Sequence, residues 1–246
     1  MNRFFVKKED ILDGAARICG EDAHHITGVL RLAPGDEVVL CDGCGTDYPA
    51  VIENADKTAV TLRVGDPSPS LTEPRAKATL YQALPKAGKL ETIIQKCVEL
   101  GVNRIVPFAA ARSVVRLTAA EFEKKRARYQ RVAYEAAKQS RRGIVPEIAP
   151  LAAFCEISPE SHGAFLFPYE EESATSLKTA LRGIVPDAVT DVAFIIGPEG
   201  GFEPSEAETL VSLGAVSVSL GPRILRTETA GPAALAMILY ELEQKA

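Results

Sequence analysis

The sequence predicts an α/β protein that consists of a small β-barrel module followed by a larger domain with a largely parallel sheet. Three observations carry this prediction. Residues 65–74 contain three prolines and two serines without a hydrophobic period, which is typical of a linker. Short apolar runs broken by turn residues precede this linker, whereas apolar strands alternate with amphipathic helices after it. We therefore expect one domain over residues 1–72 and a second over residues 73–246.

In the first domain, β-like runs lie between clusters of turn residues. They cover residues 4–6, 16–18, 38–40, 48–52 and 60–63. One helix-like stretch, residues 22–30, interrupts them. Short strands with a single helix favour a small β-barrel over half of a nucleotide-binding sheet.

In the second domain, strands and helices follow each other along the chain. A strand is expected at residues 78–83 and a helix at 89–100, whose apolar residues recur at helical spacing: Leu90, Ile93, Ile94, Cys97 and Val98. Gly101 should end this helix. A strand at 104–107 follows, and Thr118 with Glu121 has the form of a capping box that opens a helix to about residue 140. Further strands are expected at 164–167, 192–196 and 216–220, and helices near 175–182, 204–213 and 228–243.

The composition is that of an ordinary globular protein. The chain has 246 residues, a formal net charge of -5, 46% hydrophobic residues and 25% charged residues. These values exclude disorder, collagen-like repeats and a disulfide scaffold. The first residues lack the apolar stretch of a secretory signal, and the longest apolar run, Ala233–Tyr240, is far below the ~20 residues that span a bilayer. We expect no membrane insertion, reduced cysteines and a cytoplasmic location.

Two glycine-containing loops are the first candidates for function. A buried apolar strand runs into Gly197-Pro198-Glu199-Gly200-Gly201, and a second one runs into Gly221-Pro222. If the two strands are adjacent, both loops line one pocket at the carboxyl edge of the sheet, where open α/β folds bind small molecules. The alternative for the first loop is a tight strand-to-helix turn.

Charged residues lie beside the second loop. Arg223, Arg226 and Glu228 follow its Gly-Pro pair. Glu228 has the alternative of complementing a helix dipole, and Arg223 that of a solvated loop cation. Arg226, at the mouth of an apolar strand, is the residue we expect to be functional.

Several other classes of site are disfavoured. The sequence has no G-x-x-x-x-G-K-[ST] motif, and Gly197–Gly201 does not fit G-x-G-x-x-G, so a P-loop hydrolase and a Rossmann dehydrogenase are unsupported. The pair Cys41 and Cys44 flanks an Asp-Gly turn without a second Cys or His pair, and we interpret it as a hairpin turn with no metal. His24, His25 and His162 are interpreted as structural.

Positive charge is concentrated in one part of the chain. Residues 112–142 contain ten Lys or Arg against three Glu, inside a protein of net charge -5. Such a stripe is typical of a surface for a polyanion, although a solvated helix face explains Lys124–Arg128 equally well. For Gln139, Arg141 and Arg142 we favour contact with RNA.

These motifs resemble a known family. Gly197–Gly201 together with Leu220-Gly221-Pro222-Arg223-Ile224-Leu225-Arg226-Thr227-Glu228-Thr229-Ala230 is similar to the paired signature of the bacterial small-subunit ribosomal RNA uridine-N3 methyltransferases, which belong to the knotted SPOUT superfamily. The resemblance extends over essentially the whole chain. Its other segments are residues 3–5, 25–31, 34–36, 94–102, 112–115, 138–140 and 145–148.

The resemblance implies a PUA-like N-terminal barrel and a C-terminal domain whose last strands and helix form a trefoil knot. It implies S-adenosylmethionine as cofactor, held in the knot largely by backbone groups of three loops. The positions that correspond here are Phe167, Pro168, Gly197, Pro198, Gly200, Gly201, Leu220, Pro222, Ile224 and Leu225. It also implies a homodimer, with small-subunit ribosomal RNA reaching one knot across the partner subunit.

The expected chemistry follows from the substrate. Uridine N3 carries an imide proton and becomes nucleophilic only when this proton has left. Arg226 is expected to stabilise the developing negative charge, and Glu228 or Glu199 to orient Arg226 or to handle the proton. Arg112 and a local patch of Arg3, Arg17 and Arg31 are the further candidates for RNA contact, although residues 1–72 hold seven basic against twelve acidic residues.

Three alternatives remain open at the level of the sequence. A knotted ribose 2′-O-methyltransferase would leave the base unchanged. A non-catalytic RNA-binding or assembly protein would keep the fold without methyl transfer. An unrelated nucleotide-binding enzyme would bind ATP or NAD tightly.

Overall fold

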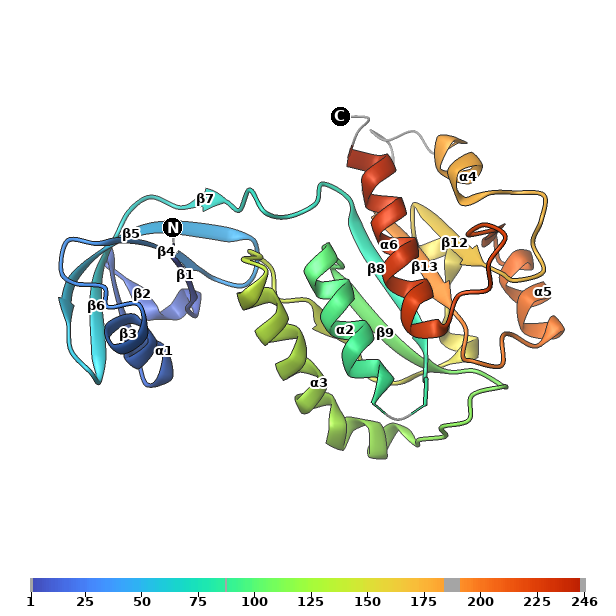
Figure 1. Ribbon diagram of the computed structural model, residues 1–246, viewed down its shortest axis with the longest axis horizontal. Coiled ribbons are helices and arrows are strands. Elements are labelled where there is room, and N and C mark those ends of the chain that lie inside the picture. Colours follow the sequence, from blue (N-terminus) through green and yellow to red (C-terminus); the bar gives the residue numbers. More distant parts are fainter. Residues whose placement is uncertain (1, 87, 184–190, 244–246) are drawn as a thin grey trace. The chain divides into compact units, whose positions relative to one another are not determined.

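The structure is a computed structural model that describes residues 2–86, 88–183 and 191–243. The chain divides into two compact units (Figure 1). Unit 1 comprises Met1–Glu73 together with Ala137–Val145, and unit 2 comprises Pro74–Ala136 together with Pro146–Ala246. The expected division into 1–72 and 73–246 did not include the return of residues 137–145 to the first unit.

Unit 1 is built around a curled, largely antiparallel sheet (Figure 1). Its strands are β1 (Asn2–Phe5), β2 (Ile11–Leu12), β3 (Ala15–Cys19), β4 (Glu37–Cys41), β5 (Thr46–Ala55), β6 (Ala59–Val64) and β7 (Ser68–Pro69). The strand order is β1-β4-β5-β6-β3-β2, with β7 paired to β5. Only the pairing of β1 with β4 is parallel among the strands that the structure describes here.

Each of the five apolar runs predicted for this unit overlaps a strand, and only Val6 of the first run lies beyond the end of β1. The helix-like stretch is also present, as α1 (Glu21–His24) followed by a π-helical turn at His25–Val29, and a short 3-10 turn spans Lys8–Asp10. Alternating residues of the strands and Ile26 of the π-helical turn fill a common apolar core. Ser68–Pro69 falls inside the predicted linker and nevertheless pairs with β5, because the linker's backbone supplies ladder hydrogen bonds that composition does not reveal.

Unit 2 has a second sheet in which every pairing between described strands is parallel. Its strands are β8 (Lys77–Ala83), β9 (Arg104–Ala109), β10 (Glu147–Ile148), β11 (Ala152–Ala153), β12 (Ala164–Pro168), β13 (Asp191–Ile196) and β14 (Val216–Val218). The strand order is β10-β9-β8-β13-β12-β14, with β11 paired to β9. The predicted α/β domain with a parallel sheet is therefore confirmed, and the short strands β10 and β11 were missed.

The helices of unit 2 pack around this sheet (Figure 1). They are α2 (Lys89–Leu100), α3 (Ala119–Gln139), α4 (Leu177–Gly183), α5 (Pro204–Ser212) and α6 (Thr227–Glu243), with 3-10 turns at Phe154–Glu156 and Pro159–Ser161. Helix α6 packs against α2, α4, β8 and β13. None of the helices in the described ranges has the length and apolarity that crossing a bilayer would require.

Local sequence signals set the helix ends. The five apolar residues predicted to face the core in α2 are all buried, and Gly101 ends the helix with a φ of 107°. At the start of α3, the Glu121 amide donates to Thr118 Oγ1 over 3.2 Å, and the Thr118 amide donates to Glu121 Oε2 over 2.8 Å. This reciprocal pair is the predicted capping box.

The two strands that end in Gly-Pro are not neighbours in the sheet. Strand β12 lies between β13 and β14 and pairs with both. The expectation of two adjacent strands is therefore wrong, because the chain inserts the earlier strand between them. As all three strands are parallel, their carboxyl ends meet at one edge and bring three loops together.

Candidate active site

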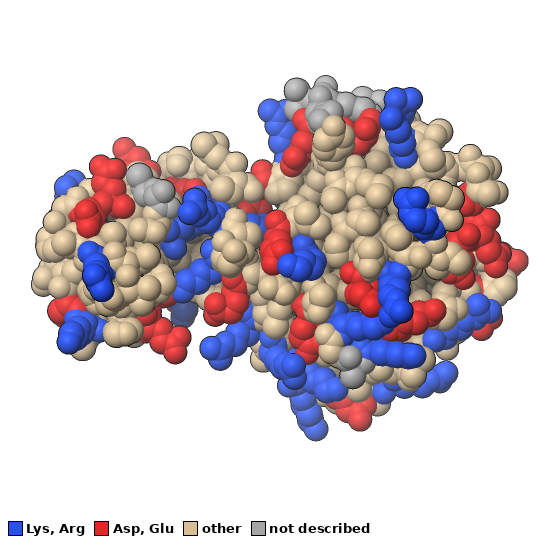
Figure 2. All heavy atoms as spheres, in the orientation of Figure 1, with Lys and Arg blue, Asp and Glu red and all other residues tan. Residues whose placement is uncertain are grey.

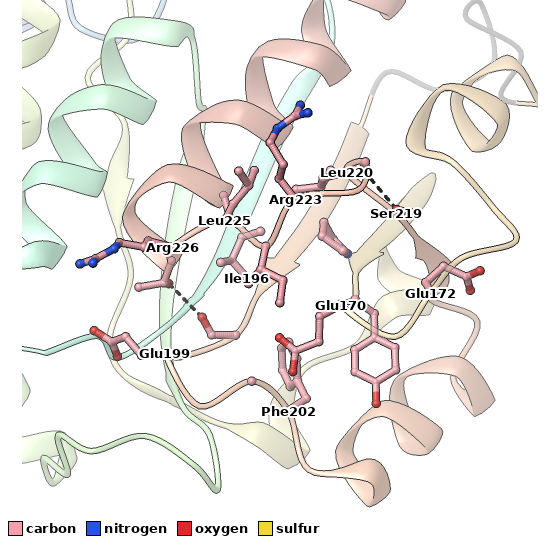
Figure 3. Close-up of a pocket in the computed structure, with 18 of the residues that line it drawn as sticks. Glu170, Glu172, Ile196, Glu199, Phe202, Ser219, Leu220, Arg223, Leu225 and Arg226 are labelled. Carbon is pink, nitrogen blue, oxygen red and sulfur yellow. Dashed lines mark hydrogen bonds between the residues drawn. The ribbon is translucent and has the colours of Figure 1, made fainter.

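A cavity of about 700 Å³ lies at the edge where β12, β13 and β14 end (Figure 3). Three loops line it: residues 168–173 after β12, residues 196–202 after β13, and residues 219–227 after β14. This volume is in the range that a small molecule fills in ligand-binding proteins. The topology thus brings together at one cavity the three loops that the resemblance implies, those at Pro168, Gly197 and Leu220.

Apolar side chains form the inner part of the cavity. Ile196 and Phe202 line it and are almost completely buried, and Leu220 and Leu225 line it while remaining partly exposed. Phe167 does not line the cavity, because its side chain is fully buried and packs edge-on against Phe202 with 5.0 Å between ring centroids. The Phe167 side chain therefore supports Phe202 from behind, and a cofactor contact of Phe167 through its backbone stays a prediction.

Two glycines of the loop after β13 could not be replaced by a larger residue without a clash, each for a different reason. Gly201 adopts a φ of 69°, and its amide donates to the Pro198 carbonyl over 3.0 Å. A Cβ at Gly201 would lie 2.6 Å from the Glu170 carboxylate, and one at Gly197 would lie 2.9 Å from the Phe202 ring. Gly200 is not among the residues that line the cavity, and a Cβ there would lie 3.2 Å from Arg112 Cβ; its cofactor contact stays a prediction.

The side-chain amide of Gln82 and the hydroxyl of Thr227 hold the loop after β13 in place. Gln82, on β8, donates from Nε2 to Thr227 Oγ1 over 3.0 Å, and Thr227 donates to the Gly197 carbonyl over 2.9 Å. Gln82 is 0% exposed and Thr227 is 5% exposed. This chain of bonds joins β8, the end of β13 and the first residue of α6. Sequence reasoning missed it, since a lone Gln within an apolar strand carries no positional signal.

Two residues of the loop after β14 line the cavity and have amides without a partner in the described chain. Ser219 is fixed by backbone bonds to Thr175 and Leu177. Beyond it, the amides of Leu220 and Leu225 donate no hydrogen bond to any described part of the chain, although both residues are partly buried. Partly buried amides of this kind need a partner, which a polar ligand or water supplies. Pro222 and Ile224 complete this side of the cavity, as predicted positions for cofactor contact.

Acidic residues follow directly after β12. Glu170 and Glu172 both line the cavity, and Figure 3 shows the Glu170 side chain close to Phe202. Hydrogen bonds from the amides of Thr175 and Ala174 lower the pKa of Glu172 below its usual range. These two residues were missed in the sequence, and their position immediately after a buried strand, beside the predicted Pro168, was the available signal.

A cluster of opposite charges stands at the rim of the cavity. Lys89, the first residue of α2, places its ammonium 3.0 Å from a carboxylate oxygen of Glu199 and 3.0 Å from one of Glu228. The Lys86 amide also donates to Glu199 over 3.1 Å. Arg226 lies next to this cluster and its side chain is exposed, extending on the Glu199 side of the loop (Figure 3). Glu199 and Arg226 line the cavity, whereas Glu228 stands behind them.

This cluster keeps its carboxyl groups ionised. Burial pushes the pKa of Glu199 upward, but the amides of Lys86 and Glu199 and the Lys89 ammonium outweigh it and lower the pKa overall. The pKa of Glu228 is lowered by its own amide at the start of α6 and then by Lys89. Close pairing with the carboxylates of Glu228 and Glu199 raises the pKa of Lys89. All three groups are therefore charged at neutral pH.

Two arginines predicted to contact RNA form hydrogen bonds and ion pairs within unit 1. Arg142 is 3% exposed and donates to Glu73, with 2.6 Å between Nη2 and Oε2. Arg3 donates to Asp47 over 2.5 Å and to Ser70 over 3.1 Å. The predicted RNA contact of Arg142 is corrected to a buried structural position, since a guanidinium without exposed surface does not reach phosphate. Arg3 is half-buried and paired with Asp47, and its RNA contact stays a prediction.

The other predicted RNA contacts stay at the surface. Arg17, Arg31, Gln139 and Arg141 are exposed, and Arg31 and Arg141 adopt left-handed backbone conformations with φ of 53° and 60°. Arg112 is exposed too, but its guanidinium donates to Glu203 over 2.8 Å and to the Gly200 carbonyl over 3.3 Å. Arg112 therefore braces the second cavity loop. Figure 2 shows Lys and Arg side chains gathered over the region of α3.

The cysteine pair of unit 1 forms a turn, as predicted. Asp42 Oδ1 accepts hydrogen bonds from the amides of Cys44 and Thr46, and Gly43 has a φ of 73°. Burial raises the pKa of the Cys41 thiol to about 12, which makes this thiol a poor nucleophile and metal ligand. In the ranges that the structure describes, no three His, Cys, Asp or Glu side chains gather in a way that could hold a metal ion.

Comparison with protein families defines the class of this protein. Residues 72–239 match the RNA methyltransferase domain, and residues 18–65 match the RNA methyltransferase PUA domain. The fold and the two matches together describe an RNA methyltransferase with an N-terminal PUA domain. The first match covers all three cavity loops.

Full-length relatives narrow the family. The ribosomal RNA small subunit methyltransferase E of Bacillus subtilis is 36% identical over 250 residues, covering 99% of this chain and 98% of the relative. That of Mycobacterium bovis is 31% identical over 243 residues, covering 96% and 90%. The chain therefore belongs to the family of ribosomal RNA small subunit methyltransferase E, which confirms the resemblance seen in its motifs.

Solved structures are similar over the same length. The ribosomal RNA small subunit methyltransferase E of Neisseria gonorrhoeae, bound to S-adenosyl methionine, has a TM-score of 0.79 and 29% identity, covering 97% of this chain and 96% of that one. A methyltransferase of Legionella pneumophila in complex with its cofactor SAM has a TM-score of 0.78 and 30% identity, covering 96% of each chain.

Proposed function

We propose that this protein transfers a methyl group from S-adenosylmethionine to N3 of a uridine in the small-subunit ribosomal RNA. The observation that carries the proposal is the cavity at the ends of β12, β13 and β14, with Arg226 and two ionised carboxylates at its rim. Family relatives of nearly full length, named ribosomal RNA small subunit methyltransferase E, support the ribosomal substrate. The choice of N3 rests on the chemistry of the rim.

The cavity has the properties that S-adenosylmethionine requires. Leu220, Leu225 and Ile196 offer an apolar surface for the adenine ring, and the unpartnered amides of Leu220 and Leu225 are donors for its polar edge. Glu170 and Glu172 are anions suited to the positive charges of the sulfonium and the amino group. When bound, this cofactor supplies an electrophilic methyl group. The two structural relatives described with this cofactor support the assignment.

Arg226 is suited to activate the uridine. The N3 imide must lose its proton before it attacks, and the negative charge then spreads onto the uracil carbonyl oxygens. A guanidinium at the rim of the cavity stabilises this anion by hydrogen bonding and by charge. Arg226 is exposed, lines the cavity and donates no side-chain hydrogen bond to any described residue.

The carboxylates act mainly through their charge. Because the pKa values of Glu199 and Glu228 are lowered, each is a weak proton acceptor for an imide. Glu228 lies close enough to Arg226 to interact with its charge, and Glu199 lies on the same side of the loop (Figure 3). We propose that both carboxylates orient the Arg226 guanidinium by their charge. The imide proton then leaves to solvent in the course of the reaction.

We further infer that the protein acts as a homodimer with a knotted C-terminal chain. Helix α6 is apolar on most of its surface and leaves Met237 and Tyr240 43% and 63% exposed, which favours burial against a second copy. Threading is supported by the order of the chain, since β14 joins the sheet beside β12 while α6, which follows it, packs on β8 and β13. Ribosomal RNA as substrate implies action in the cytoplasm, with unit 1 as an RNA-binding PUA domain.

The proposal is tested by identifying the modified nucleoside. Purified protein is incubated with S-adenosylmethionine and small ribosomal subunits from cells that lack the modification, and the digested RNA is analysed by mass spectrometry. We expect 3-methyluridine. A ribose-methylated uridine would instead establish 2′-O transfer, and binding of S-adenosylmethionine without any new nucleoside would leave a non-catalytic RNA-binding protein.

Two variants test the role of Arg226. Arg226→Ala should lower the rate of methyl transfer by roughly 100-fold, because it removes a charge that acts on the anion, while changing the affinity for S-adenosylmethionine less than about threefold. Arg182→Ala is the control and should keep the wild-type rate, since Arg182 is an exposed arginine of α4 outside the cavity lining. Equal losses of rate and cofactor affinity in Arg226→Ala would make it a cofactor ligand.

A further inference from the structure

Lys89 has no role in the sequence motifs or in the proposed chemistry, yet it contacts two of the residues at the rim. It opens α2, whereas Glu199 follows β13 and Glu228 belongs to the first turn of α6. Its Nζ atom lies 3.0 Å from each carboxylate, and the Lys89 side chain is 26% exposed. A single ammonium thus joins three elements that are separated in sequence.

The position of Arg226 makes this arrangement informative. An arginine beside two carboxylates normally pairs with one of them, because guanidinium and carboxylate form short charge-assisted hydrogen bonds. Here both carboxylates bind Lys89, and Arg226 forms no ion pair with any residue that the structure describes. Arg226 nevertheless lies close enough to Glu228 to lower its pKa. The guanidinium thus lies near this cluster and forms no ion pair within the described ranges.

We propose that Lys89 is a positioning residue: by binding Glu199 and Glu228 it keeps the Arg226 guanidinium free for the methyl acceptor. This inference rests on the proposed function of the site. These two ion pairs, which we call the Lys89 clamp, also hold the loop after β13 against the start of α6. Thr227, the residue before Glu228, holds the same loop by donating to the Gly197 carbonyl. Without Lys89, two uncompensated carboxylates would compete with the substrate for Arg226.

The test compares Lys89→Met with Lys89→Arg in the full-length protein. Lys89→Met should lower kcat by roughly 10–100-fold and leave the KM for S-adenosylmethionine within about twofold, because the loss concerns the orientation of one group at the acceptor. Lys89→Arg should recover most of the rate, since a guanidinium also bridges two carboxylates. If Lys89→Met does not fold, Lys89→Gln is used with the same expectations.

Lys96→Met is the matched control. Lys96 lies on the same helix, but its ammonium pairs over 3.0 Å with Glu99, which is not one of the carboxylates at the rim. We expect its kinetics to equal those of the wild type. Equal kinetics of Lys89→Met and Lys96→Met would overturn the proposal, as would a parallel loss of kcat and cofactor affinity in Lys89→Met.

A double variant tests whether Lys89 acts through Arg226. If it does, adding Lys89→Met to Arg226→Ala should lower the rate by less than about threefold more, because the group that Lys89 protects is already absent. Multiplying losses would show that Lys89 acts independently and would contradict the proposal.

A measurement without turnover separates this inference from the proposed reaction. In carbon-13 NMR titrations of the glutamate carboxyl groups, Lys89→Met should raise the pKa values of Glu199 and Glu228 toward their usual range, since the cation that lowers them is gone. Unchanged values would refute the clamp even in an active enzyme. Absence of 3-methyluridine with the wild type would refute the function while these titrations still decide the clamp.

Discussion

Single residues of the cavity are determined by contacts that come from other loops. Gly201 shows this in two ways, since its backbone has a φ of 69° and the Glu170 carboxylate occupies the space where a Cβ would lie. The first property belongs to the turn itself. The second is a property of the site, because Glu170 comes from the neighbouring loop and lines the cavity.

Gly201→Ala should therefore affect both stability and cofactor binding. The left-handed conformation costs an alanine about 1–2 kcal/mol of folding free energy. The added methyl group also displaces the flexible Glu170 side chain, and we expect a roughly fivefold loss of S-adenosylmethionine affinity, equivalent to about 1 kcal/mol. Chemical denaturation and calorimetric titration measure the two effects.

Gly214→Ala is the control for this prediction. Gly214 has a φ of 95° but nothing within 4 Å of an added Cβ. It should lose similar stability and keep its cofactor affinity. A Gly201→Ala protein that binds S-adenosylmethionine as the wild type does would show that the position of Glu170 is unimportant.

At the scale of elements, local sequence signals predicted the helix ends but not the order of the strands. The bounds of α2 and the capping box of α3 agree with prediction, because both depend on residues within one or two turns. The place of β12 between β13 and β14 was not predictable, since strand order is decided by packing between distant segments. The clamp of Lys89 on Glu199 escaped for the same reason.

Helix α6 carries the prediction that belongs to this scale. Tyr240→Glu places a charge on the exposed apolar face that we assign to the dimer, and burying an unpaired carboxylate there should cost about 3 kcal/mol. This corresponds to a more than 100-fold weaker dimer in sedimentation experiments. Val211→Glu, on an exposed apolar position of α5, should leave the dimer intact. A wild-type protein that sediments as a monomer would contradict the homodimer.

At the scale of the whole molecule, unit 1 is assembled from two separate stretches of chain. Glu73 connects them, because its carboxylate accepts hydrogen bonds from Arg142 and from the amides of Gly143 and Ile144 at 2.6, 2.7 and 3.0 Å. The Cys41 thiol and the Gly45 amide also bond to the Gly143 carbonyl. In the sequence, Arg142 was interpreted as an RNA contact because of its charge. Its acidic partner Glu73 lies 69 residues earlier and could not be recognised from the sequence.

Glu73→Gln should destabilise unit 1 strongly. It removes the negative charge that pairs with the buried Arg142, and breaking a buried ion pair in this way typically costs about 3 kcal/mol or more. Glu53→Gln removes a partner of Arg63 from an exposed pair and should cost less than about 1 kcal/mol. Urea denaturation followed by tyrosine fluorescence measures both losses, since the chain has no tryptophan. Equal free energies of unfolding for Glu73→Gln and the wild type would show that the Glu73 contacts are energetically unimportant.

The divided composition of unit 1 also bears on how the protein is made. Domains commonly fold one after another as they emerge during synthesis, the first part of the chain before the second. Here the first unit lacks its last stretch, Ala137–Val145, until the ribosome has also produced Pro74–Ala136 of the other unit. The nascent N-terminal segment must therefore wait, with Glu73 still lacking Arg142, while much of the catalytic unit is translated.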